Sequence, residues 1–170
     1  MTTSRHIDVL IVGAGPSGLM LAAQLLRMGV QPTVIDAKQG PERTSRAIAV
    51  HARSLELFRQ LGLADRLVAE GVTAYGLQVQ GRSGRLVAVD FAGMESPRTA
   101  YPFVLLVSQE KTERLLIDRL TENACPVHWD TRLESVRQDD QAVTVTVQHG
   151  GDIEQWSCGW VVGADGVGST

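Results

Sequence analysis

The 170-residue sequence has few cysteines, few aromatic residues and no excess of positive charge, and each shortage excludes a class of protein. Its two cysteines, Cys125 and Cys158, lie far apart and form no C-x-x-C pair, so neither a disulfide scaffold nor a zinc site is expected. A net charge of −3 and an aromatic content of 5% provide no basic field and no stacking platform. We therefore expect a cytoplasmic protein with reduced thiols and with no metal, nucleic-acid or membrane partner.

A charge-free run from Val9 to Leu26 is long enough to suggest a signal peptide or a short membrane span. Three glycines and a proline interrupt this run at Gly13, Gly15, Pro16 and Gly18, where they would break a spanning helix. The same residues suit a tight turn between a strand and a helix, so we expect no targeting segment.

The first forty residues have the pattern of a strand–helix–strand unit. Ile7–Val12 is a short apolar run rich in β-branched residues, which is typical of a buried strand. Ser17–Met28 carries apolar residues at helical spacing and stops at Gly29, and Thr33–Ile35 is a second apolar run. Such an order predicts parallel strands joined by a right-handed crossover.

The turn between the first strand and the helix satisfies the pattern G-x-G-x-x-G with the sequence Gly13-Ala14-Gly15-Pro16-Ser17-Gly18. Glycines cluster in many turns, so the motif gains weight from its place after an apolar strand and before a helix. Gly13 permits the tight turn, Gly15 lets a pyrophosphate approach the backbone, and Gly18 allows the helix to pack closely on the strand. Unpaired amides in the first helical turn, which includes Pro16 and Ser17, favour an anion there.

Asp36 follows the second strand, 18 residues after Gly18, where this type of unit places an acidic residue. A carboxylate at that point accepts hydrogen bonds from a ribose hydroxyl and repels a 2′-phosphate. The unit therefore predicts a site for FAD or NAD rather than NADP, and by itself it does not separate FAD from NAD.

Further elements follow along the chain. A helix over Ala52–Leu61 has one apolar face, and alternation over Leu77–Phe91 predicts a hairpin around residues 81–84. Val104–Val107 reads as a buried strand, and Ser108 can cap a helix that ends near Asn123. A brief strand is expected over Val127–Trp129. Three alternating stretches then predict a three-stranded meander, over Leu133–Arg137, Val143–Val147 and Ile153–Trp156. The last apolar stretch is Trp160–Val162.

Three segments beyond the first unit carry a family resemblance. They are Ser45–Phe58, which leads into Leu61-Gly62-Leu63; Val107-Ser108-Gln109, which leads into a helix; and Val161–Ser169, which contains Asp165-Gly166. With the glycine-rich unit they resemble the FAD-dependent aromatic hydroxylases, the p-hydroxybenzoate and phenol hydroxylase group of flavoprotein monooxygenases. The likeness extends over nearly the whole chain in the order and spacing of that family.

The resemblance implies further cofactor contacts. Arg46 would reach the FAD phosphates or ribose, and Gln109 would contact the pyrophosphate–ribityl region. Asp165 and Gly166 look like the motif of that family that supports both FAD binding and use of the nicotinamide cofactor. Without the resemblance, Arg46 is a solvated surface residue, Gln109 a polar residue of a first turn, and Asp165-Gly166 an ordinary turn after a strand.

The fold implied is α/β, a Rossmann-like FAD-binding fold with a parallel sheet, a β-meander crossover and the start of a substrate-domain sheet. Residues 1–74 would be the first part of the FAD-binding domain and 75–100 the start of the substrate-binding sheet. Residues 101–170 would be the second part of the FAD-binding domain, incomplete at its carboxyl end.

The resemblance also implies an activity. In this family NADH or NADPH reduces FAD, and the reduced flavin uses O₂ to hydroxylate a small aromatic substrate. No side chain here is a convincing acid or base for that chemistry, so no catalytic residue is named. A second Gly-Asp motif of the family lies well beyond Asp165, so we expect the chain to be a piece of a longer polypeptide and inactive alone. A binding module without turnover and an NAD-dependent dehydrogenase remain the alternatives.

Overall fold

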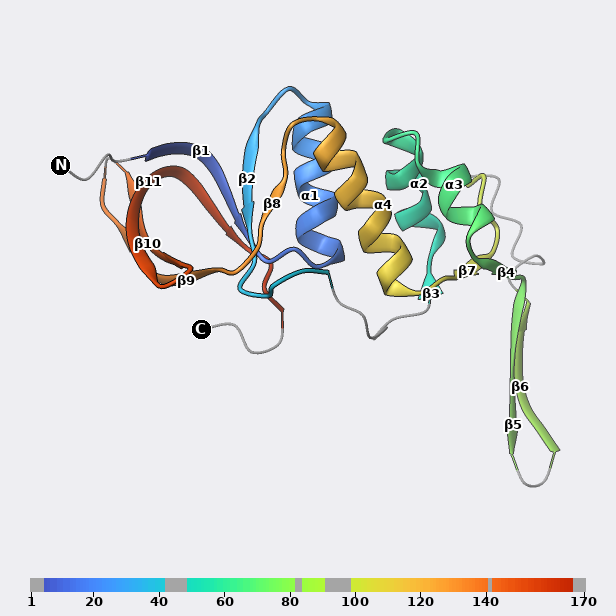
Figure 1. Cartoon of the computed structure of the whole chain (residues 1–170). Helices are drawn as coiled ribbons and strands as arrows, with labels where there is room; N and C mark the ends of the chain where they lie inside the picture. Colours follow the sequence, from blue (N-terminus) through green and yellow to red (C-terminus); the bar gives the residue numbers. More distant parts are fainter. Residues whose placement is uncertain (1–4, 42–48, 82–83, 91–98, 141, 167–170) are drawn as a thin grey trace. The chain divides into compact units, whose positions relative to one another are not determined.

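The structure, a computed structural model, describes residues 5–41, 49–81, 84–90, 99–140 and 142–166 (Figure 1). The chain divides into two compact units. The first comprises Met1–Glu42 and Glu113–Thr170, and the second comprises Arg43–Thr112. Each unit is described by itself below. No helix among the described residues has both the length and the apolar character needed to cross a bilayer.

The first unit is built on a six-stranded sheet in the order β8-β2-β1-β11-β10-β9. Neighbours among β8, β2, β1 and β11 run parallel, whereas β9, β10 and β11 form an antiparallel meander. The predicted parallel α/β fold and its meander are therefore confirmed. The strands and the crossover helix are β1 (Arg5–Val12), α1 (Pro16–Arg27), β2 (Pro32–Ile35), β8 (Val127–His128), β9 (Thr131–Gln138), β10 (Val143–His149) and β11 (Asp152–Gly163).

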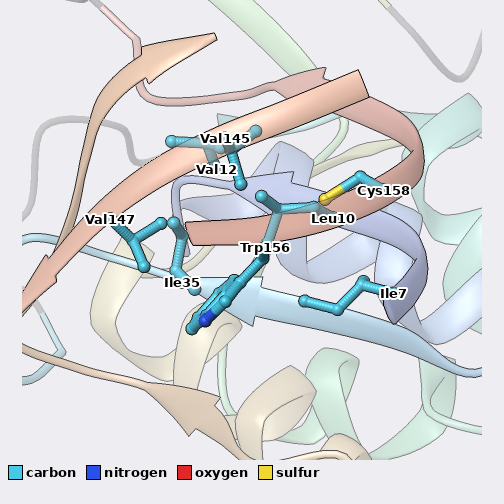
Figure 2. Close-up of a cluster of buried hydrophobic side chains, with 8 residues drawn as sticks. All are labelled: Ile7, Leu10, Val12, Ile35, Val145, Val147, Trp156 and Cys158. Atoms are coloured by element: carbon cyan, nitrogen blue, oxygen red, sulfur yellow. The ribbon is translucent and has the colours of Figure 1, made fainter. Parts of the chain in front are cut away.

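Apolar side chains cover both faces of the parallel strands. Helix α1 contacts β1 and β2, and it buries Gly18, Leu19, Ala22 and Ala23. On the meander side a second cluster forms around Trp156, which is 5% exposed. Each large apolar side chain removed from water contributes about 1.5–3 kcal/mol, so this cluster holds the meander to the parallel strands. Its members, drawn in Figure 2, are Ile7, Leu10, Val12, Ile35, Val145, Val147, Trp156 and Cys158.

Strand β11 differs from the sequence prediction, which treated Ile153–Trp156 and Trp160–Val162 as separate stretches. The structure joins them in one 12-residue strand that pairs with β10 along its first part and with β1 along its second. Gly159 lies between the two stretches. A Cβ atom there would lie 2.8 Å from the Asp8 carbonyl oxygen, so this glycine lets the two strands approach.

The second unit holds two small antiparallel sheets. Strands β3 (Ala49–Val50), β7 (Val104–Leu106) and β4 (Val72–Ala74) form one in the order β3-β7-β4, and β5 (Gly76–Gly81) with β6 (Gly84–Asp90) forms the predicted hairpin. Helices α2 (Ala52–Gln60) and α3 (Ala64–Ala69) belong to the same unit.

The prediction of a buried strand at Val104–Val107 was only partly right. Strand β7 ends at Leu106, and it buries Leu105 completely while Leu106 is 39% exposed. Elements β3, β4 and α3 were not predicted, because elements of two to six residues are too short to establish a period.

Helix α4 (Gln109–Glu122) contains the boundary between the two units, and it ends as a Schellman motif. The Cys125 amide donates to the Leu120 carbonyl at 3.0 Å, and the Ala124 amide donates to the Thr121 carbonyl at 3.1 Å. Ala124 has a φ of 54°, in the left-handed region where a Cβ atom is strained.

Ala124→Gly should therefore stabilise the protein, because glycine adopts this conformation without strain. We expect a gain of about 1 kcal/mol in the free energy of unfolding, measured by urea denaturation. Glu122→Gly, two residues earlier and inside the helix, is the matched control and should lose about 1 kcal/mol. A lower stability of Ala124→Gly would contradict the assignment.

Candidate functional site

The predicted site residues of the first unit gather at one edge of its sheet. Because β1, β2 and β11 run parallel, their carboxyl ends meet at that edge, where open α/β sheets bind ligands. The segments that leave these strands carry the glycine-rich turn, Asp36 and Asp165-Gly166. Residues more than 150 positions apart in sequence thus become neighbours.

Gly13 and Gly18 let three segments of backbone approach one another. Gly13 has a φ of +107°, and its amide donates to the Ile35 carbonyl at 2.8 Å. A Cβ atom on Gly13 would lie 2.5 Å from the carbonyl carbon of Ala164, and one on Gly18 would overlap the Gly13 carbonyl oxygen. The close packing expected of Gly18 is therefore observed, and no other residue fits either position.

Gly15 differs from these two glycines, because a Cβ atom there would meet nothing within 4 Å. It is the N-cap of α1, with φ −78° and ψ 178°, and it makes no side-chain cap hydrogen bond. Pro16 begins the helix without an amide hydrogen, and Ser17 beside it is exposed. The first turn thus has open space beside it and no acidic side chain, as an anion would require.

Asp36 lies against the glycine-rich turn and is 8% exposed. One carboxylate oxygen, Oδ2, accepts the Ala14 amide at 2.7 Å, and the other, Oδ1, accepts the Lys38 amide at 2.9 Å. Its own backbone continues the sheet, since its amide donates to the His128 carbonyl and its carbonyl accepts the Thr131 amide, both at 3.0 Å. The carboxylate is therefore held in a fixed position by the backbone around it.

Asp165 and Gly166 follow β11 next to the same turn. The Ala164 amide donates to the Val12 carbonyl at 2.7 Å, which fixes the start of this segment beside β1. Asp165 is exposed, and Gly166 has a φ of +79°.

Two other predicted residues do not belong to the described part of the first unit. Gln109 is the first residue of α4 and belongs to the second unit, where it is half-buried. Ser108 accepts the Lys111 amide on its side-chain oxygen at 3.4 Å, so the predicted cap forms with a long hydrogen bond. Arg46 lies outside the described residues.

Sequence reasoning missed the partners that shape the site. Ala164 packs against the position of Gly13, and the Ala14 and Lys38 amides bind Asp36. No pattern of residue types marks these contacts, since they involve backbone atoms.

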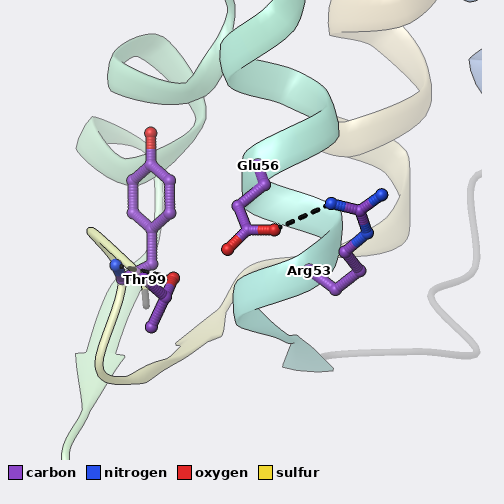
Figure 3. Close-up of polar contacts among 4 residues, drawn as sticks. Arg53, Glu56 and Thr99 are labelled. Atoms are coloured by element: carbon purple, nitrogen blue, oxygen red, sulfur yellow. Dashed lines mark hydrogen bonds and ion pairs between the residues drawn. The ribbon is translucent and has the colours of Figure 1, made fainter. Parts of the chain in front are cut away.

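The segment Ser45–Phe58 that carries part of the resemblance ends in an ordered polar contact (Figure 3). On α2, Arg53 donates to Glu56 at 3.0 Å, and the Thr99 side chain also hydrogen-bonds Glu56. These hydrogen bonds, that from Arg53 first, lower the pKa of Glu56. Thr99 in turn accepts the Tyr101 amide at 3.2 Å. The contact ties residues 99–101 to α2, and we assign it a structural role.

The cysteines are both buried and unlinked. Burial raises the pKa of the Cys125 thiol and of the Cys158 thiol. Neither thiol is therefore activated as a nucleophile.

The residues at the sheet edge fit the ADP half of a dinucleotide. The open space beside Gly15 is a cradle that a Cβ atom would fill, and it lies at a helix N-terminus suited to phosphates. The Asp36 carboxylate retains acceptor capacity, since a carboxylate has about four acceptor sites and two are used.

Comparisons with known proteins agree with this geometry. A family model described as an FAD binding domain matches residues 6–170. The sequence is 43% identical over 163 residues to the 6-methylpretetramide 4-monooxygenase of Streptomyces rimosus, covering 96% of this chain and 29% of that protein. It is 35% identical over 169 residues to the pentachlorophenol 4-monooxygenase of Sphingobium chlorophenolicum, covering 98% and 31%.

Solved structures give the same result. The p-nitrophenol 4-monooxygenase of Pseudomonas putida superposes with a TM-score of 0.90 at 26% identity, over 98% of this chain and 42% of that one. A flavin-dependent monooxygenase in complex with FAD and substrate superposes with a TM-score of 0.84 at 27% identity, over 96% and 31%.

The chain thus spans less than a third of the length of either curated relative. The resemblance to flavoprotein aromatic hydroxylases that the sequence carries is confirmed over this span. With a match over residues 6–170, the chain belongs to the family of FAD-binding domains found in flavin-dependent aromatic monooxygenases.

Proposed function

We propose that this chain holds the FAD of an NADH- or NADPH-dependent monooxygenase that hydroxylates an aromatic substrate. The observation that carries the proposal is the packing of the glycine-rich turn against Ala164. It brings a phosphate-binding helix start, a buried carboxylate and the Asp165-Gly166 segment to one edge of the sheet. A dinucleotide that lies along this edge meets all three.

Each part of this edge suits one part of FAD. The pyrophosphate would lie against the open backbone at Gly15 and the first turn of α1, which begins at Pro16 and continues through Ser17 and Gly18. About two acceptor sites of Asp36 remain for the two hydroxyls of a ribose. The same carboxylate would repel a 2′-phosphate, which disfavours NADP at this position.

The family resemblance adds four residues to the proposed contacts. Arg46 would bind the phosphates or ribose, and Gln109 the pyrophosphate–ribityl region. Asp165 with Gly166 would support both FAD binding and use of the nicotinamide cofactor. Asp165 is exposed beside Gly13, which suits a contact with a ligand on the same edge.

When bound and reduced, FAD supplies the electrons with which one atom of O₂ enters an aromatic ring and the other leaves as water. The described residues would orient the cofactor, and we propose none of them as an acid or base for the ring chemistry. The relatives are named as monooxygenases of 6-methylpretetramide and of pentachlorophenol, so we propose a phenol-like or polyketide-like aromatic substrate. Two buried thiols suit the reducing cytoplasm.

The hairpin β5–β6 would begin the substrate-binding sheet at residues 75–100, flanked by the two parts of the FAD-binding domain at 1–74 and 101–170. Among the described residues its strands pair only with each other. An isolated two-stranded hairpin is marginally stable in water, so further strands are expected to extend it.

The choice of cofactor can be measured directly by titration of the purified chain with FAD, FMN and NAD. We expect FAD to bind at least about tenfold more tightly than FMN, because FMN lacks the ADP half that the glycine-rich turn and Asp36 suit. Quenching of flavin fluorescence measures the binding of FAD and FMN, and calorimetry measures the binding of NAD. Equal affinity for FMN and FAD, or tighter binding of NAD than of FAD, would contradict the proposal.

Gly15→Ala tests the phosphate site without disturbing the fold. The added methyl meets nothing within 4 Å and the φ of −78° suits alanine, so the unfolding midpoint should not fall. The methyl projects into the space proposed for the pyrophosphate, so FAD affinity should fall about tenfold or more.

Gly40→Ala is the matched control for this variant. A Cβ atom at residue 40 also meets nothing within 4 Å, and Gly40 is not part of the glycine-rich turn. It should keep both stability and FAD affinity. An unchanged FAD affinity of Gly15→Ala would contradict the proposal that the pyrophosphate lies beside Gly15.

The activity should be tested on the complete open reading frame of the natural gene, supplied with FAD. NADH or NADPH oxidation should accelerate when a phenolic or tetracyclic aromatic compound is added. With ¹⁸O₂, one labelled atom should appear in the hydroxylated product. Nicotinamide oxidation that no aromatic compound of either class stimulates would refute the monooxygenase assignment.

A further inference from the structure

We propose that Asp36 is a positioning residue that builds the phosphate-binding turn before any cofactor arrives. The proposal deepens the function proposed above, which gives Asp36 the ribose alone. Its basis is that the Asp36 carboxylate already binds two backbone amides within the protein.

The first of these amides belongs to the turn itself. Ala14 lies between the two glycines at the start of the motif, and its amide donates to Asp36 Oδ2 at 2.7 Å, a short distance for an amide donor. Ala14 is 2% exposed, so this amide has little access to water. Without the carboxylate, the amide would be a buried donor without a partner, which is costly.

The second amide locks the carboxylate in place. Lys38 donates to Oδ1 at 2.9 Å, and the Lys38 carbonyl accepts the Asp130 amide at 2.7 Å. The carboxylate therefore bridges the turn after β1 and the segment that follows β2, and Lys38 joins that segment to the one that follows β8. Each oxygen has one backbone partner, so rotation of the carboxylate would break both hydrogen bonds.

This arrangement links ribose recognition to the phosphate site. The hydrogen bond of the Ala14 amide fixes the orientation of the Gly13–Ala14 peptide group, one peptide unit ahead of Gly15, the residue beside the open space. A carboxylate that lost its position would release the turn as well as the sugar. Asparagine is the sharp substitution, because its single oxygen can accept only one of the two amides.

The experiment is residue-resolved hydrogen exchange of the cofactor-free chain, by NMR. In the wild-type protein the Ala14 amide should be protected although it lies in a turn. In Asp36→Asn, exchange at Ala14, Lys38 or both should accelerate about tenfold or more, while Leu10 in the centre of β1 keeps its protection.

Asp130→Asn is the matched control, since it makes the same chemical change in an exposed residue that follows β8 at the same edge. It should leave exchange at Ala14 unchanged. Rapid exchange of Ala14 in the wild-type chain, or unchanged exchange at both Ala14 and Lys38 in Asp36→Asn, would overturn the proposal. The wild-type arm decides the question even if the variant unfolds.

The outcome is separable from the proposed function. A chain with a protected Ala14 amide that binds no FAD would refute the function and leave the positioning role intact. A chain that binds FAD but leaves the Ala14 amide unprotected would support the proposed function and refute the positioning role of Asp36.

Discussion

The first unit depends on one close approach of backbone to backbone, that of the glycine-rich turn to the segment after β11. At Gly13 a single methyl group would collide with Ala164, and at Gly18 it would collide with the Gly13 carbonyl. Protein interiors are packed too tightly to absorb such overlaps by small shifts. The approach is therefore available only while both positions are glycine, and it brings Asp165 beside the start of α1. The strand order of the sheet is consistent with this approach. Strand β11 lies directly beside β1, so the segment that follows β11 reaches the turn that follows β1.

The three glycines of the motif are thus needed for two different physical reasons. Gly13 and Gly18 are required by the protein's own backbone, whereas Gly15 has open space beside it and a φ that any residue can adopt. A glycine that the fold does not require, at a helix N-terminus, indicates that something outside the chain needs the room. Asp36 has the corresponding property among polar groups. Its carboxylate is buried and bonded within the protein, yet each oxygen keeps acceptor capacity that the protein does not use.

Much of the first unit could be predicted because its signals are local. The strand Ile7–Val12 and the second strand follow from short apolar runs, and the helix that begins at the motif follows from apolar residues at helical spacing. The parallel sheet follows from the order of these three elements. The joining of Ile153–Trp156 and Trp160–Val162 in one strand could not be predicted, since a glycine that lets β1 approach β11 at residue 159 has the same appearance in sequence as one that ends a strand. The short elements β3, β4 and α3 were missed for lack of a period. The contacts of Asp36 with Ala14 and Lys38 could not be predicted, because backbone amides leave no mark on the pattern of residue types.

The division between what binds the cofactor and what selects the substrate has a physical origin. The ADP half of a dinucleotide is the same in every enzyme that uses it, so a helix N-terminus, a backbone turn and one carboxylate suffice, and these leave a sequence signature. An aromatic substrate is selected by the shape and polarity of a pocket assembled from many side chains, which no short motif encodes. Relatives named for 6-methylpretetramide and for pentachlorophenol are 43% and 35% identical to this chain over the span. Their common sequence therefore reports the cofactor, and the difference between their substrates must arise from other residues.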